Sequence, residues 1–384
     1  MAANQDFGVV VIGAGDMGVR HARGWQMAGA KVVAVCDPDE ARALAAALPL
    51  GALGLRIPDD VLGRDDVHAV SVCTPTVYHA PYTVQALEAG KHVLCEKPVS
   101  LTLDDAETMQ RAAQTSGKTL RIGFMRHFDP AYRQLVAMHG GIGGPVLAQA
   151  TIAAGVRPKL LMHDARVNGG PIIDMCCHLF NLWSTLFGAQ PTVVSARGYT
   201  FSDGKAEVAT IEHKALDSAQ ITLEYPGGTL GQVQVSWGLP AGIIPTESHT
   251  YMAPNGLISV DWSERLTLHD ASGETTWQTD GADPWHAQIA YFYRELTEDA
   301  PQRVATIDDG IAALRTSLAV LESVRTQQPI DPATLQPRAT TSPSADVPVI
   351  STTTTTPAST PASTAGHDGS AAPTPGSTTS KPDA

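Results

Sequence analysis

Short apolar runs alternate with helical patterns along the first part of the chain. Five such runs predict β-strands at Gly8–Ile12, Lys31–Cys36, Ala69–Cys73, His92–Cys95 and Thr119–Gly123. The segments between them predict helices at Met17–Ala28, Glu40–Ala47, Val77–Ala89 and Leu103–Ser116. Because the strands lack a polar face, helices are expected to cover both faces of their sheet, as is typical of parallel sheets. The pattern therefore predicts an α/β domain with a doubly wound parallel sheet.

After about residue 143 the pattern changes. A strand at Val146–Ala153 and a helix at Ile173–Phe187 precede a series of strand-like runs separated by turn signals. These runs are Val208–Glu212, Ala219–Tyr225, Thr229–Ser236, Gly256–Val260 and Leu266–His269. Two closing helices are expected at Pro284–Glu298 and Asp308–Gln327. This region predicts an α+β domain built on a mostly antiparallel open sheet.

The end of the chain has a different composition. From Ala339 to Ala384 it consists almost entirely of Thr, Ser, Pro, Ala and Gly. Such a segment cannot bury enough apolar surface to offset the entropy of ordering it. We expect a disordered tail at 339–384, with a glycosylated stalk as the alternative. The preceding chain divides into a predicted nucleotide-binding domain at 1–124 and a predicted substrate-binding domain at 125–330.

Composition narrows the class of protein. The chain of 384 residues carries 26 Lys and Arg against 39 Asp and Glu, a formal net charge of −13, which argues against a nucleic-acid binder. Its 5 cysteines are too few for a disulfide framework. No apolar run approaches the ~20 residues of a membrane span, and the first residues lack the pattern of a secretion signal. A cytoplasmic location without membrane partners is the expectation.

A glycine-rich loop follows the first predicted strand. Gly13, Gly15 and Gly18 form a G-x-G-x-x-G motif that opens a helix, with Ala14, Asp16 and Met17 between them. The spacing is typical of a dinucleotide loop, in which the helix N-terminus binds the pyrophosphate. The next strand ends at Asp37, whose carboxylate can accept hydrogen bonds from ribose hydroxyls and would repel a 2′-phosphate. NAD is therefore favoured over NADP. The alternative to a dinucleotide loop is a glycine-rich turn that binds nothing.

A second candidate is Lys97, which follows the strand at His92–Cys95. Ligands of doubly wound sheets bind at the carboxyl ends of the strands, so Lys97 is expected to face the cofactor crevice. The Lys97–Pro98 bond is a candidate cis peptide. The alternative, a surface lysine at a strand end, is favoured when this segment is taken alone.

A third candidate lies on the helix at Ile173–Phe187. Asp174 and His178 are four residues apart and Asn181 is three further on, so a continuous helix would place them on one side. An Asp and a His that face a cleft can form an acid–base unit, in which the carboxylate stabilises the imidazolium. The alternative is an Asp favoured by the helix dipole and an unrelated His. Adjacent helical residues diverge by about 100°, so Cys176, Cys177 and His178 do not suggest a metal site.

Together these segments resemble the Gfo/Idh/MocA oxidoreductases, a family named for glucose–fructose oxidoreductase and inositol dehydrogenase. The resemblance rests on residues 13–18, on Cys95-Glu96-Lys97-Pro98, and on Gly169-Gly170 with Asp174 and His178. Cys73-Thr74-Pro75 with His79 is similar to the family's cofactor-facing loop. The segment from Gly123 to Asp129 is most similar to the inositol dehydrogenase branch.

The resemblance implies a Rossmann domain, hydride transfer between NAD(P) and a secondary hydroxyl of a cyclitol or sugar, and a homodimer or homotetramer. It implies catalytic roles for Lys97, Asp174 and His178, and it places Arg126 and Asn181 at the substrate. The implied cofactor contacts also include Thr74, Pro75, His79, Glu96 and Lys97. We expect His178 to act as base, Asp174 to orient it, and Lys97 to stabilise negative charge on the reacting oxygen. Alternatives are a sugar or glycoside dehydrogenase, a keto-sugar reductase, or a non-enzymatic dinucleotide-binding regulator.

Overall fold

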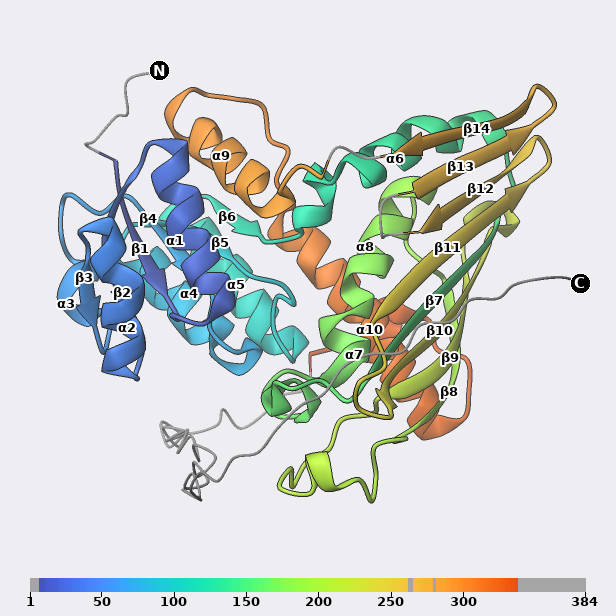
Figure 1. The fold of residues 1–384 in the computed structure, drawn as a ribbon, viewed down its shortest axis with the longest axis horizontal. Helices are drawn as coiled ribbons and strands as arrows, with labels where there is room; N and C mark the ends of the chain where they lie inside the picture. Colours follow the sequence, from blue (N-terminus) through green and yellow to red (C-terminus); the bar gives the residue numbers. More distant parts are fainter. Residues whose placement is uncertain (1–6, 262–264, 279–280, 338–384) are drawn as a thin grey trace, which may run out of the picture. The chain divides into compact units, whose positions relative to one another are not determined.

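The computed structural model describes residues 7–261, 265–278 and 281–337 (Figure 1). Its first sheet has six strands in the order β3-β2-β1-β4-β5-β6, and every neighbouring pair is parallel. The strands are β1 Gly8–Ile12, β2 Lys31–Cys36, β3 Leu53–Leu55, β4 Ala69–Val72, β5 His92–Cys95 and β6 Leu120–Ile122. The order of the strands reverses between β1 and β4, which creates the crevice in which doubly wound folds bind ligands. The predicted parallel sheet is confirmed.

Helices cover both faces of this sheet. They are α1 Asp16–Ala28, α2 Glu40–Ala47, α3 Asp59–Leu62, α4 His79–Glu88 and α5 Leu103–Ser116. The side chains of Asp39 and Thr102 cap α2 and α5, whereas α1 begins after Gly15 without a side-chain cap. The sequence pattern missed β3 and α3, because elements of three and four residues are too short to show a period.

The second sheet has eight strands in the order β14-β13-β12-β11-β7-β10-β9-β8. They are β7 Leu147–Gly155, β8 Val193–Tyr199, β9 Ser218–Glu224, β10 Leu230–Leu239, β11 Thr246–Ala253, β12 Gly256–Asp261, β13 Arg265–Asp270 and β14 Gly273–Gln278. Only the central β7–β10 pair is parallel. The predicted mostly antiparallel sheet, and with it the α+β class, is confirmed.

One face of the second sheet is packed against helices, as the alternating burial along β7 and β10 shows. The helices are α6 Pro130–Ile142, α7 Gly170–Asp174, α8 Cys176–Phe187 and α10 Ile307–Thr326, all on one side of the sheet in Figure 1. Trp183 and Tyr251 are among the largest fully buried side chains of this core.

Several local expectations for this region are wrong. The predicted strand Val208–Glu212 is a short 3-10 helix at Ala206–Val208 followed by a turn, and Val208 and Ile211 pack with Val156 in a small separate cluster. The strands β8, β11 and β14 were not predicted; β14 is almost entirely exposed and therefore lacks an apolar pattern. The predicted helix Ile173–Phe187 is divided into α7 and α8 by Met175.

Both closing helices pack against elements of the first region. Helix α9, Pro284–Thr297, packs on α1, and its Ile289 and Phe292 join the core that contains Trp25. Helix α10 contacts α5 and β6 of the first region and α8 and β8 of the second. The sequence places both helices in the second domain, but burial assigns α9 to the Rossmann core. The predicted tail lies outside the described residues, and no described helix is long and apolar enough to cross a membrane.

Candidate active site

The three glycines of the loop after β1 differ in their steric surroundings. Gly13 has φ of 97°, and a Cβ there would lie 2.6 Å from the carbonyl oxygen of Cys73. A Cβ on Gly18 would lie 1.7 Å from the carbonyl oxygen of Gly13, so helix and loop can pack only around a glycine. A Cβ on Gly15 would meet nothing within 4 Å. The loop therefore leaves open space at the uncapped N-terminus of α1.

These surroundings fit a dinucleotide. A helix N-terminus without a side-chain cap offers N–H donors to a pyrophosphate. Asp37 lies at the end of β2, where its Oδ2 accepts from the Ala14 amide at 2.9 Å and its Oδ1 from the Asp39 amide at 2.9 Å. Each carboxylate oxygen retains a lone pair for a ribose hydroxyl. The Thr74 hydroxyl oxygen, after β4, is buried without a hydrogen-bond partner among the described residues.

The negative charge of Asp16, at the start of α1, is paired with a cation. Its carboxylate is exposed and forms an ion pair with Lys159 from the second region. The hydrogen bond and charge of Lys159 lower the pKa of Asp16. The charge at the start of α1 is therefore balanced by a residue about 140 positions away in sequence.

Lys97 extends from the end of β5 toward α7. Its peptide bond to Pro98 is cis, as predicted. The Nζ atom donates to the carbonyl oxygen and to Oδ1 of Asp174, both at 3.0 Å, and the Lys97 side chain is 19% exposed. Burial alone would lower the pKa of Lys97, but the acidic groups around it, Asp174 foremost, together outweigh burial and the pKa is raised. Lys97 is therefore held as a cation.

The predicted Asp174–His178 unit is corrected by the structure. Asp174 is the last residue of α7, and His178 lies on α8 beyond Met175. The Asp174 carboxylate pairs with Lys97, and within the described part of the chain His178 Nδ1 is buried without a partner. Burial, with the charges of Lys97 and Arg126, places the pKa of His178 well below its usual range. The imidazole is thus disposed to be neutral.

Arg126 lies in the short helix Met125–Phe128 and is buried beside the second sheet. Its two Nη atoms donate to Oε1 and Oε2 of Glu247 on β11, each at 2.6 Å. Burial raises the pKa of Glu247, but the charge and hydrogen bonds of Arg126, together with those of His249, outweigh burial and the pKa falls well below the usual range. The sequence pattern missed Glu247, because it lies in the polar run of an unpredicted strand.

Asn181 follows His178 on α8 and contacts His127, which lies in the same short helix as Arg126. Its Oδ1 lies 2.6 Å from Nε2 of His127, which can donate to it. Burial lowers the pKa of His127. Asn181 is therefore positioned by His127, which the sequence interpretation did not single out.

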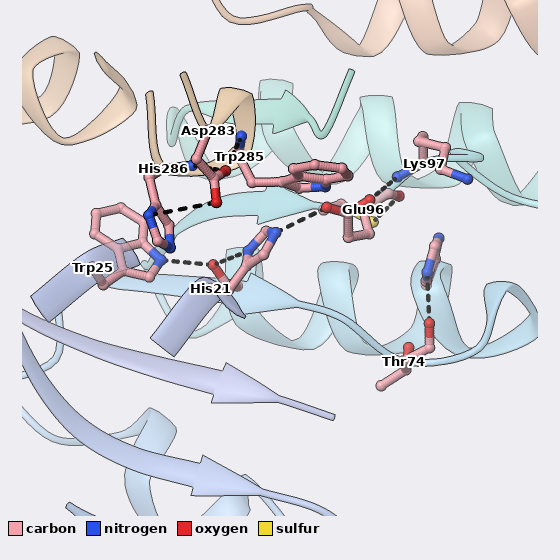
Figure 2. Close-up of polar contacts among 11 residues, drawn as sticks. His21, Trp25, Thr74, Glu96, Lys97, Asp283, Trp285 and His286 are labelled. Atoms are coloured by element: carbon pink, nitrogen blue, oxygen red, sulfur yellow. Dashed lines mark hydrogen bonds and ion pairs between the residues drawn. The ribbon is translucent and has the colours of Figure 1, made fainter. Parts of the chain in front are cut away.

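Two residues expected at the cofactor, His79 and Glu96, form hydrogen bonds within the protein. The ring nitrogens of His79 lie 2.7 Å from the Pro98 carbonyl oxygen and 2.9 Å from that of Thr74. Glu96 is 5% exposed; its Oε1 pairs with His21 at 2.8 Å and its Oε2 accepts from the Lys97 amide at 3.1 Å (Figure 2). His79 thus connects the loops that carry Thr74 and Pro98, and Glu96 connects His21 of α1 to the backbone of Lys97.

The glycine loop at residues 13–18, Asp37 at the end of β2 and Lys97 after β5 are together typical of an NAD-binding oxidoreductase. A family model described as an oxidoreductase family with an NAD-binding Rossmann fold matches residues 7–124, and the GFO/IDH/MocA C-terminal domain matches residues 131–249. The chain belongs to the GFO/IDH/MocA oxidoreductase family.

Three similar proteins illustrate the range of the family. The chain is 28% identical to scyllo-inositol 2-dehydrogenase (NAD(+)) of Bacillus subtilis over 340 residues, which cover 83% of this chain and 94% of that protein. It is 27% identical to 1,5-anhydro-D-fructose reductase of Ensifer adhaerens over 278 residues, 70% of this chain and 81% of that one. The crystal structure of an oxidoreductase domain protein from Kribbella flavida matches with a TM-score of 0.76 and 25% identity, covering 85% of this chain and 99% of that chain.

Proposed function

We propose that this protein is an NAD-dependent dehydrogenase that oxidises a secondary hydroxyl of an uncharged cyclitol or sugar. The observation that carries the proposal is the arrangement of Lys97 and His178. Lys97 is a cation held by Asp174, and its charge helps to lower the pKa of the buried His178 imidazole. A fixed proton donor at the end of a Rossmann strand and a neutral proton acceptor on α8 suit the removal of a hydroxyl proton.

The substrate class follows from the charges around this pair. Lys97 is paired with Asp174, and Arg126 is paired with Glu247. Each of these two cations thus has a carboxylate partner, and His178 is disposed to be neutral. A site balanced in this way offers hydrogen bonds without net charge, which favours a polyol over a sugar acid or a sugar phosphate. The names of the scyllo-inositol and anhydrofructose enzymes support the same class.

In the proposed mechanism, NAD held by the loop at residues 13–18 and by Asp37 would supply the acceptor for the hydride that leaves the carbon of the reacting hydroxyl. The His178 imidazole takes the hydroxyl proton. The ammonium of Lys97 has three N–H donors, of which Asp174 accepts two through its carbonyl and carboxylate oxygens. The third donates to the reacting oxygen and stabilises its developing negative charge. Asp174 therefore orients Lys97, and Arg126 and Asn181 bind further substrate hydroxyls.

Reduction of a keto-sugar is the second candidate. The similarity to 1,5-anhydro-D-fructose reductase favours it. The same residues would serve, with a protonated His178 returning its proton to the carbonyl oxygen while Lys97 polarises it. The two directions differ in the protonation of His178, so their rates respond oppositely to pH.

The test compares His178→Ala with His92→Ala. His92 begins β5, at the end of the strand opposite to Lys97. Initial rates are measured with NAD on inositol isomers, neutral aldoses, glucuronate and glucose 6-phosphate, and NAD affinity is measured by calorimetry. We expect turnover of a neutral polyol, a kcat at least about a hundredfold lower for His178→Ala, unchanged NAD affinity, and little effect of His92→Ala. A near-normal kcat for His178→Ala, or a preference for the charged sugars, contradicts the proposal.

A further inference from the structure

A continuous chain of buried hydrogen bonds runs through the Rossmann domain and ends beside Lys97 (Figure 2). The indole Nε1 of Trp25 donates to Ser71 Oγ at 2.7 Å, and Ser71 Oγ lies 3.1 Å from His21 Nδ1. His21 Nε2 lies 2.8 Å from Glu96 Oε1. Trp25, Ser71 and His21 are fully buried and Glu96 nearly so. We call these four residues the Rossmann relay.

With a neutral imidazole, one arrangement of protons satisfies every atom of the Rossmann relay. An indole nitrogen can only donate, so Ser71 accepts from Trp25. An ionised carboxylate can only accept, so His21 donates from Nε2 to Glu96. The Ser71 hydroxyl then donates to the free Nδ1 of His21. The tautomer and ring orientation of His21 are thereby set by a tryptophan on its own helix.

The relay holds Glu96 in one place. Its second oxygen, Oε2, accepts from the backbone amide of Lys97 at 3.1 Å. Behind it lies Gly123, where a Cβ would be 3.0 Å from the Glu96 carboxyl group, so a larger residue would press against the carboxylate. Burying a carboxylate is unfavourable unless it is paired and hydrogen-bonded. Glu96 meets that condition through His21 and through the backbone amide of Lys97. Lys97 is also the residue that the proposed mechanism requires in a fixed position.

His21 lies on α1, in the turn that follows the glycine loop, and Glu96 lies at the end of β5. The relay therefore joins the element that binds the dinucleotide to the backbone of Lys97. We propose that His21 and Glu96 are positioning residues, which fix Lys97 relative to the first turns of α1 so that its ammonium meets the reacting oxygen. This inference rests on the role of Lys97 in the proposed function.

The charge of Glu96 also reaches the ammonium. Burial lowers the pKa of Lys97, and the negative groups around it, Glu96 among them, raise it above its usual value. Neutralising Glu96 is therefore expected to lower the pKa of Lys97. The other titratable groups that face Lys97 come from α4, α7 and α8: His79, Asp174, Cys177 and His178. A substitution at Glu96 leaves these four residues in place, but it also removes a charge that opposes the lowering of the His79 pKa by burial.

The test uses graded variants of the full-length protein. His21→Leu removes the donor to Glu96, and His21→Gln keeps an N–H at about the same reach. Ser71→Ala removes only the hydroxyl that orients His21, which is a milder change. Ser317→Ala is the matched control, because Ser317 is equally buried but donates to a carbonyl within α10. Glu96→Gln removes the charge and keeps an acceptor for the Lys97 amide. Lys97→Ala is the reference for loss of the ammonium.

A positioning role predicts a fall in kcat without a change in NAD affinity. We expect kcat to fall about 10- to 100-fold for His21→Leu, to recover in part for His21→Gln, and to fall about 2- to 10-fold for Ser71→Ala. Ser317→Ala should match the unmodified protein. For Glu96→Gln the alkaline limb of the kcat profile should move to lower pH, because a less basic Lys97 loses its proton earlier.

Two outcomes overturn the inference. If the His21 and Ser71 variants lower stability or NAD affinity but leave kcat and its pH profile unchanged, the relay is a structural support of α1 only. If Glu96→Gln leaves the alkaline limb in place, Glu96 does not act on Lys97. Failure of the proposed function is separate: it appears as a near-normal kcat of Lys97→Ala, whatever the relay variants do.

Discussion

The two halves of the molecule contain the same sequence of hydrogen-bonding groups in different settings. In the Rossmann domain an indole, a hydroxyl, an imidazole and a carboxylate follow one another in the Rossmann relay. In the second half Trp183 of α8 donates to the hydroxyl of Tyr251 on β11 at 3.1 Å, and that hydroxyl lies 3.0 Å from His249 Nδ1. His249 Nε2 lies 3.0 Å from Glu247 Oε1. We call this second set, Trp183, Tyr251, His249 and Glu247, the sheet relay.

The relays differ at the end that reaches the site. Glu96 accepts the backbone amide of Lys97, so its charge stays beside the lysine without pairing with the ammonium. Glu247 takes both Nη atoms of Arg126 and neutralises the guanidinium. The same polar chain can therefore keep one cation available for chemistry and bury another as a neutral pair. The difference lies in whether the carboxylate meets a backbone amide or a charged side chain.

The largest expected difference is in stability. Glu247→Ala leaves the buried Arg126 guanidinium without its carboxylate, which should lower the free energy of unfolding by about 3–5 kcal/mol. Glu96→Ala removes a charge and two hydrogen bonds but strands no buried cation, so a loss of about 1–3 kcal/mol is expected. Urea denaturation measures both. The double variant Glu247→Ala with Arg126→Leu should regain part of the loss, and equal losses for the two single variants would contradict the comparison.

A second expected difference is in kinetics. His21→Leu should lower kcat, whereas His249→Leu should mainly raise KM for the polyol, about tenfold. The reason is that the Rossmann relay positions the group at the reacting oxygen, and the sheet relay supports the Arg126–Glu247 pair that binds other hydroxyls. Steady-state kinetics at saturating NAD separate the two. A common effect on kcat alone would mean that both relays serve the reacting group.

The pH profile sharpens the comparison further. Burial and the charges of Lys97 and Arg126 lower the pKa of His178, and Glu247 opposes them. Oxidation needs neutral His178, so activity is lost as pH falls through that pKa, on a limb below pH 6.5. Removing the Glu247 charge by Glu247→Gln should lower the pKa again and move the acid limb to still lower pH. Glu96→Gln should leave the acid limb in place, and a shift of that limb by both variants would contradict the separation.

Cofactor choice should respond to neither relay. Asp37 lies at the end of β2 and contacts the Ala14 and Asp39 amides, away from both carboxylates. Asp37→Ala should raise the use of NADP relative to NAD, because the charge that repels a 2′-phosphate is gone. His21→Leu and His249→Leu should leave the NAD-to-NADP ratio of kcat/KM unchanged. Faster turnover of NADP than of NAD by the unmodified protein would remove Asp37 from this role.

The local sequence pattern predicted much of the fold and part of the candidate site. The strands β1, β2 and β5 and the helices α2 and α5 begin and end where the apolar pattern predicts, because each is long or apolar enough to be recognised alone. Strand β11 was missed because its residues are mostly polar, although His249 and Tyr251 are buried. The helix break at Met175 was also missed, as was the pairing of Asp174 with Lys97.

The sequence by itself determined the two sheets, the glycine loop with Asp37 and the place of Lys97 at a strand end, because these depend on periodicity and spacing within short segments. The tertiary structure alone decided which charges meet. Lys97 and Asp174 are 77 residues apart, Arg126 and Glu247 are 121 apart, and His21 and Glu96 are 75 apart. A buried charge requires a partner of opposite sign or a matching hydrogen bond. Which residue supplies it depends on how the elements pack, and no local pattern of the chain encodes that choice.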